Sequence, residues 1–274
     1  MPFLYPFGRY PPNAALVKRV TTAADRLRGL IAETDVSRLD GDEYSKKRFL
    51  KGKLRELDHN LTKYAFHVSW IMHLADVPPE QIVLIDHGGG TGLQGLLAKV
   101  AGVGTVIYND INERVLSVAR ALGEAIELPC NHYVLGDIGP LFDYLDARGI
   151  VPSAMVSYDV LEHIYDVDAF FQQLARLCRG PLALFLSSGA NMFSPRYVLK
   201  LIPVQWRAER RYRAERRAMI AEMAPQLSAR ELTKLARATQ GLCRPDIEKT
   251  VAGFLATGST SEPPRSRTNA FPAS

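Results

Sequence analysis

The chain has 274 residues, 47% of them hydrophobic, and a formal net charge of +5, which is the composition of an ordinary globular protein of one large domain or one domain with an added cap. No apolar run approaches the roughly 18 residues of a membrane-spanning helix, and the N-terminus lacks a secretory signal pattern, so we expect a cytoplasmic protein. Residues 203–217 hold six arginines and two glutamates, a local charge of +4 that leaves only +1 for the rest. This distribution disfavours general nucleic-acid binding.

The first 80 residues are predicted to form a helical cap. Apolar residues recur at helical spacing over Ala14–Glu33, and Asn13 is placed to cap this helix. A second helical stretch is expected from about Asp42 to Ala75, ended by the prolines at 78 and 79. The three widely spaced cysteines, Cys130, Cys178 and Cys243, predict buried free thiols rather than a disulfide or a metal site.

Residues 81–190 change to an alternation of short apolar strands and helices. Such an alternation is typical of right-handed βαβ units in a parallel sheet covered on both faces, with ligands beyond the carboxyl ends of the strands. The expected strands are Ile82–Ile85, Thr105–Asn109, His132–Leu135, Ala154–Tyr158 and Leu182–Leu186. The expected helices are Leu93–Ala101, Asn112–Gly123, Leu141–Ala147 and Val167–Cys178.

No further strand is predicted after Ser188. Residues 191–257 form a predicted helical C-terminal region with Pro225 and Pro245 as breaks, and residues 258–274 have the composition of a disordered tail.

A glycine-rich turn follows the first predicted strand. Asp86 ends the strand, glycines stand at 88, 89, 90 and 92, and a helix pattern begins at Leu93. Glycines let a ligand approach bare backbone, and the helix N-terminus offers unpaired N–H groups to a negative group. The spacing of Asp86, Gly88, Gly90 and Gly92 resembles the first motif of class I S-adenosylmethionine-dependent methyltransferases, and these four residues are predicted to bind the cofactor.

Two further acids follow predicted strands. The resemblance implies that Asp110, after the second strand, accepts hydrogen bonds from ribose hydroxyls and that Asp137, after the third, faces the adenine amine. Either acid is alternatively a helix cap. Ile111 and Ile138 are predicted to supply apolar faces for the purine, or else to belong to the core.

The segment after the fourth strand, Ser-Tyr-Asp-Val-Leu-Glu-His-Ile at 157–164, is similar to one found in small-molecule methyltransferases. The resemblance places Tyr158 beside the cofactor and, with Asp159, at the acceptor. His163 is a candidate general base, with helix-start packing as its alternative. Tyr64, His67 and Trp70 are candidates for the acceptor wall, although aromatic residues at this spacing are more often core.

The resemblance covers residues 82–187. It implies a Rossmann-like doubly wound sheet of order 3-2-1-4-5, S-adenosyl-L-methionine as cofactor, and methyl transfer to a small-molecule or glycan- or lipid-precursor acceptor. Counterparts of the family's sixth and seventh strands are not found in the sequence.

Three alternatives remain open. Gly90-Thr-Gly-Leu-Gln-Gly95 also fits the pattern Gly-x-Gly-x-x-Gly of an NAD(P)-dependent oxidoreductase. The chain is otherwise a non-catalytic methyltransferase-like binding protein, or a metal-assisted enzyme that uses Asp159 and Asn191.

The arginine-rich helix expected at 206–217 has three interpretations. It is a solvated face on which Glu209 and Glu215 pair with arginines, a lid over an acidic or phosphorylated acceptor, or a contact with an anionic membrane through Trp206 and Tyr212.

Overall fold

The computed structural model describes residues 9–40, 43, 46–47, 51–177, 179–188 and 195–260. The contacts divide the chain into two compact units. The first unit comprises Met1–Tyr158 and Phe170–Ser187, and the second comprises Asp159–Ala169 and Ser188–Ser274. The N-terminal helices belong to the same unit as the sheet, and the loop after the fourth strand belongs to the other unit.

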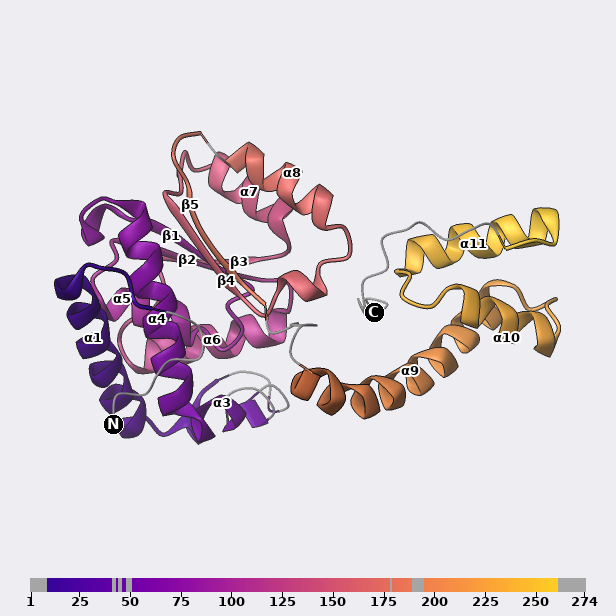
Figure 1. Cartoon of the computed structure of the whole chain (residues 1–274), viewed down its shortest axis with the longest axis horizontal. Helices are drawn as coiled ribbons and strands as arrows, with labels where there is room; N and C mark the ends of the chain where they lie inside the picture. The colour runs from indigo at the N-terminus through magenta and orange to yellow at the C-terminus, as the bar shows by residue number, and fades with distance from the viewer. Residues whose placement is uncertain are drawn as a thin grey trace. The chain divides into compact units, whose positions relative to one another are not determined.

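The first unit is built on one parallel sheet in the order β3-β2-β1-β4-β5 (Figure 1). The doubly wound fold and its strand order are thus confirmed. Because β1 lies between β2 and β4, the chain changes direction across the sheet at the β1–β4 boundary, which is where such sheets bind ligands. No strand follows β5 in the described part of the chain. The strands are β1 (Val83–His87), β2 (Thr105–Asp110), β3 (His132–Leu135), β4 (Ala154–Tyr158) and β5 (Ala183–Ser187).

Two of the differences from the predicted bounds have a local reason. β1 continues through Asp86 and His87, because both residues pair in register with β2, so Asp86 lies inside the strand rather than at its end. The helix α7 (Ile138–Asp146) begins three residues before the predicted Leu141, because the side chain of Asp137 caps it.

One face of the sheet is covered by α4 (Leu57–Ala75), α5 (Leu93–Val100) and α6 (Glu113–Ala125), and α1 (Ala14–Glu33) lies outside α4 and α5 (Figure 1). The bounds of α1 and its cap, Asn13, agree with the prediction. Helix α4 packs against β4 and β5, and α1 packs against α4 and α5. The predicted second helical stretch contains α4 and the shorter α3 (Lys51–Arg55) among its described residues.

The opposite face is covered by α7 and α8 (Val167–Leu177) (Figure 1). Ile85, Ile107 and Met155 occupy matching positions of β1, β2 and β4 and are fully buried. Because successive strand residues point to opposite faces, they lie on the other side of the sheet from Leu84, Val106 and Ala154, which belong to the larger core. Short 3-10 helices complete the connections at Val36–Arg38, Pro79–Gln81 and Leu161–His163.

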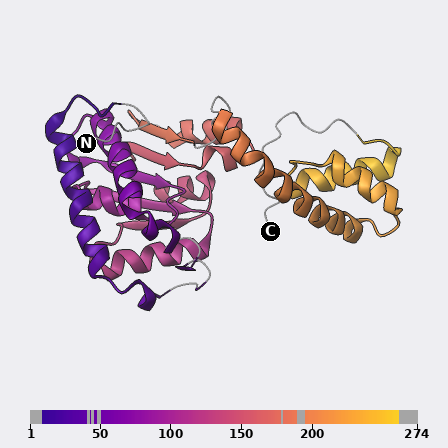
Figure 2. The same cartoon turned by 60° about the horizontal axis from the view of Figure 1, so that its bottom comes forward.

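The second unit contains α9 (Pro195–Met223), α10 (Ala229–Ala238) and α11 (Arg244–Thr257). Figure 2 shows α10 and α11 lying beside the C-terminal half of α9, and they share a small core of their own with Ile220 and Leu235 at its centre. Pro245 stands in the first turn of α11 and so begins that helix rather than breaking it. Pro203 lies inside α9.

Several remaining expectations concern single residues. Cys130 is a buried free thiol and Cys243 a half-buried one, whereas Cys178, Asn191 and most of the predicted tail (261–274) lie outside the described residues. None of the helices searched in the described chain combines the length and apolarity needed to cross a membrane.

Candidate functional site

The glycine turn between β1 and α5 adopts a backbone that favours glycine. Gly88, Gly90 and Gly92 have φ of 65°, 54° and 77°, in the left-handed region where a Cβ is costly. Gly92 N donates to Gly89 O at 2.9 Å and closes the turn, and Gly89 N donates to Asn109 O of β2 at 3.1 Å. The turn is therefore attached to the neighbouring strand.

The glycines differ in what surrounds them. A Cβ at Gly89 would stand 2.6 Å from Cε2 of Tyr108, and one at Gly95 would stand 3.0 Å from Oδ2 of Asp86, so packing excludes side chains there. A Cβ at Gly90 would meet no protein atom nearer than Gly88 O, at 3.9 Å. Space beside Gly90 is thus open, as a ligand that rests on the turn requires.

Asp86 lies beneath the turn with 1% of its surface exposed. Its Oδ2 accepts from Gly95 N at 2.9 Å and its Oδ1 accepts from Gln94 Nε2 at 3.2 Å. Burial raises its pKa from 3.8 to about 7, against the opposing effect of these two bonds. The carboxylate of Asp86 thus faces the interior and holds the start of α5, and its contact with a cofactor stays a prediction.

Asp110, at the end of β2, grips the glycine turn directly. Its Oδ2 accepts from Gly90 N at 3.0 Å and its Oδ1 accepts from Asn112 N at 2.9 Å, while the hydroxyl of Tyr108 donates to Gly90 O at 2.6 Å. Burial raises the pKa of Asp110, and the backbone bonds oppose that rise. Asn112, not Asp110, caps α6, so the alternative of a helix cap does not apply to Asp110.

The residues that were expected around a purine ring fall into two environments. Ile111 is 74% exposed, which leaves its apolar side chain accessible next to Asp110. Ile138 is buried, and the structure favours the core alternative for it. Asp137 is exposed and caps α7 by accepting from Gly139 N at 3.0 Å, so the cap alternative holds for one of its carboxylate oxygens.

A buried histidine that sequence reasoning passed over ties the ends of three strands together. Nδ1 of His87 lies 2.6 Å from Oδ1 of Asn109, and Asn109 Nδ2 donates to the carbonyls of Val134 and Gly136. The amide oxygen must then accept, so we assign the proton of His87 to Nδ1. Burial lowers the pKa of His87, which favours the neutral ring. Its place within the motif, between Asp86 and Gly88, was the available signal.

A second buried network joins α4 to the glycine turn. Nδ1 of His67 lies 2.9 Å from Oε1 of Gln94, the residue whose amide donates to Asp86. The ring of His67 stacks 5.2 Å from the ring of Tyr158 at the end of β4, and Nζ of Lys63 lies 3.9 Å from the same ring. Polar residues four apart on the buried face of α4 were the signal for this network.

The three candidates for the acceptor wall lie in different surroundings. Tyr64 and His67 are buried in the first unit, and the indole Nε1 of Trp70 donates to Arg9 O at 3.0 Å. Burial favours the core alternative for Tyr64 and His67, whereas Trp70 is half-buried.

The candidate catalytic residues Asp159 and His163 belong to the second unit, whereas the glycine turn, Asp110, Asp137 and Tyr158 belong to the first. Asp159 has φ of 55°, which is uncommon for a residue other than glycine. The imidazole of His163 is exposed, and its backbone N–H donates to Val160 O. The same segment is anchored in its unit by Tyr165, whose hydroxyl donates to Asp246 Oδ2 of α11 at 2.5 Å.

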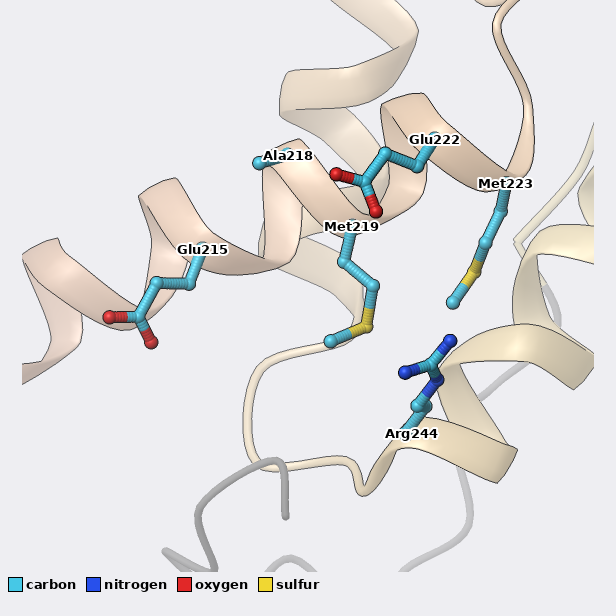
Figure 3. Close-up of a pocket in the computed structure, with 6 residues that line it drawn as sticks. All are labelled: Glu215, Ala218, Met219, Glu222, Met223 and Arg244. Atoms are coloured by element: carbon cyan, nitrogen blue, oxygen red, sulfur yellow. The ribbon is translucent and has the colours of Figure 1, made fainter. Parts of the chain in front are cut away.

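The second unit also contains a cavity of about 460 Å³ between α9 and α11 (Figure 3). Met219 and Met223 project into it with Glu215, Glu222 and Arg244 around them, and it includes none of the predicted site residues. Among the residues that were searched in the described chain, no group of three potential metal ligands occurs.

Comparisons with known proteins add little to this geometry. No protein-family model matches the chain, and no curated protein matches it. Two solved structures of magnesium protoporphyrin IX methyltransferase from Synechocystis PCC 6803 are similar to it. The one with bound SAH is 21% identical over 67% of this chain and 75% of that chain, with a TM-score of 0.37. The one with bound SAM is 19% identical over 63% and 81%, with a TM-score of 0.35. Likeness of this size does not establish a ligand or an activity.

Proposed function

We propose that the first unit binds S-adenosyl-L-methionine across the carboxyl ends of β1, β2 and β3, and that the chain transfers its methyl group to a small-molecule acceptor or a glycan or lipid precursor. The observation that carries this proposal is the grip of Asp110 on Gly90. The carboxylate of Asp110 accepts the N–H of Gly90, beside which space is open. Asp110 also lies at the carboxyl end of β2, where the sugar of a bound nucleoside would contact it.

Different residues of the first unit contact different parts of the cofactor in this proposal. The bare backbone at Gly88 and Gly90 accommodates the amino-acid portion. Asp110 keeps lone pairs for ribose hydroxyls beside its two backbone donors. Exposed Ile111 offers an apolar surface to the purine, and Asp137 retains one carboxylate oxygen for the adenine amine.

The position of Asp86 disfavours the dinucleotide alternative. A dinucleotide rests its diphosphate on the N-terminal N–H groups of the helix after the turn. Here the carboxylate of Asp86 accepts the N–H of Gly95 in the first turn of α5. The buried acid thus occupies one of the donors that a diphosphate would use.

The cofactor when bound supplies an electrophilic methyl group on a sulfonium. The chain's task is then to align the acceptor with that group, to exclude water, and to remove a proton where the acceptor carries one. We assign proton removal to His163, whose imidazole is exposed, and acceptor contact to Asp159 and Tyr158.

Calorimetry with S-adenosylhomocysteine tests the cofactor site. We expect binding by the wild-type chain and a loss of about 10- to 100-fold in affinity for Asp110→Ala, because a hydrogen bond to a charged group contributes about 1.5–3 kcal/mol. Asp143→Asn, which removes the charge of an exposed acid on α7, is the matched control and leaves affinity unchanged. Tight binding of NADH without binding of S-adenosylhomocysteine would refute the proposal.

Transfer of a tritiated methyl group to fractionated metabolites, polysaccharide precursors and lipids tests catalysis. His163→Ala should slow transfer by roughly 10²- to 10⁴-fold, as loss of a general base does, while leaving the affinity for S-adenosylhomocysteine unchanged. Retained cofactor binding with no transfer to any fraction would favour the non-catalytic binding protein instead.

A further inference from the structure

The N-terminal part of α9 exposes a concentrated group of large apolar side chains. Leu199, Ile202, Val204 and Trp206 are exposed by 68%, 48%, 54% and 75%. Single exposed apolar residues are normal, but contiguous ones mark contact surfaces. Three of them, Leu199, Ile202 and Trp206, recur at helical spacing and form a patch, whereas Val204 lies about 140° around the helix from Leu199.

Helical geometry aligns this patch with cations further along α9. Leu199, Ile202 and Trp206 are spaced i, i+3 and i+7, which places them on one face of the helix. Arg210 and Arg217 follow Leu199 by eleven and eighteen residues, close to three and five whole turns at about 3.6 residues per turn. One stripe of roughly 27 Å, at about 1.5 Å per residue, thus begins apolar and ends cationic.

The arginines of α9 separate into two groups. Arg216 is buried and pairs with Glu209 at 2.6 Å, and Arg213 and Arg211 pair with Glu209 and Glu215. Arg207, Arg210 and Arg217 are exposed and take part in none of the ion pairs among the described residues. Local pairing, the simplest interpretation of this segment, therefore accounts for only half of its six arginines.

We propose that the stripe of α9 from Leu199 to Arg217 binds the surface of an anionic lipid bilayer, with the helix lying in the interface. Trp206 stands where the apolar and cationic parts meet, a position that suits an indole at the headgroup level. The three exposed arginines complement anionic headgroups. A nucleic acid would satisfy the arginines but not the adjoining leucine and isoleucine, so a lipid surface fits the whole stripe better. This proposal is independent of the methyl-transfer function.

Binding to vesicles of neutral phosphatidylcholine, with and without 30% phosphatidylglycerol, tests the proposal on the full chain. A Trp70→Phe variant leaves Trp206 as the sole tryptophan, because the chain has two. We expect co-sedimentation with anionic vesicles, a blue shift of Trp206 emission on binding, and weakening by salt. If the wild-type chain bound neutral and anionic vesicles with the same affinity, the proposal would be overturned.

Charge-matched variants locate the contact. Replacing Arg207, Arg210 and Arg217 by glutamine should lower the vesicle partition constant about 100-fold, since each cation near such a surface contributes roughly a fivefold factor. Replacing exposed Lys18, Arg19 and Arg26 of α1 changes the net charge equally and should alter partition less than about twofold. Equal loss in both variants would show attraction by net charge alone and would refute the stripe. An unchanged Trp206 emission on binding, or equal affinity for duplex DNA, would also refute it.

Discussion

Replacing the buried acid under the glycine turn, Asp86→Asn, should reverse its effect on stability between acid and alkaline pH. Burial raises the pKa of Asp86 from 3.8 to about 7, so between these values the folded chain holds a proton that the unfolded chain has released. The free energy of unfolding therefore falls as the pH rises through this window, by up to about 1.4 kcal/mol per pH unit and roughly 4 kcal/mol in all. The amide variant lacks this titration.

The expected result is a difference in unfolding free energy between variant and wild type that grows with pH. At pH 5 the wild-type side chain is a neutral acid, and the variant is equally stable or slightly less stable. At pH 8 the wild type carries a buried carboxylate, and the variant gains up to about 4 kcal/mol relative to it. The amide still accepts from Gly95 N, and its NH₂ group donates to Gln94 if that amide turns over.

Denaturant unfolding at pH 5, 6, 7 and 8 measures this difference. A Trp206→Phe background leaves Trp70 of α4 as the reporter for the first unit. Asp35→Asn is the control, because hydrogen bonds from Ser37 lower the pKa of that exposed acid and it stays ionised throughout the range. A difference for Asp86→Asn that does not change from pH 5 to pH 8 would show that the carboxylate is not desolvated as the structure implies.

Three further substitutions test the packing of each unit. Gly89→Ala should destabilise the first unit by about 1–3 kcal/mol, because its Cβ would stand 2.6 Å from the ring of Tyr108; an unchanged denaturation midpoint would contradict this. Arg216→Ala should cost the second unit about 1.5–3 kcal/mol, because the buried guanidinium donates to Glu209 of α9 and to the carbonyl of Ala236 in α10; Trp206 fluorescence in a Trp70→Phe background follows the unfolding, and an unchanged stability would contradict this. Tyr165→Phe should raise the pKa of Asp246, because the hydrogen bond from the tyrosine hydroxyl lowers that pKa more than any other contact. An NMR titration that finds the same pKa of Asp246 in the variant would refute this role of Tyr165.

Local signals in the sequence were sufficient for much of the first unit. Asn13 and the apolar spacing after it predicted α1 with its bounds unchanged, since a cap and a helical period are properties of neighbouring residues. The alternation of apolar strands and helices predicted a parallel sheet, because a helix between two strands connects them as a right-handed crossover and few other topologies are possible. The glycine turn was visible because a left-handed backbone demands glycine at Gly88, Gly90 and Gly92.

Tertiary packing decided the roles of the site residues. Asp86 is predicted as a ligand contact from the sequence, and only the pairing of β1 with β2 shows that it lies inside the sheet and holds the start of α5. The contacts of His67 and His87 join residues far apart in the chain, so the local pattern can single out these histidines but not their partners. The loop with Asp159 and His163 follows β4 directly, yet it shares a unit with α11. Burial and partnership depend on which distant segments meet, and that information exists only in the folded chain.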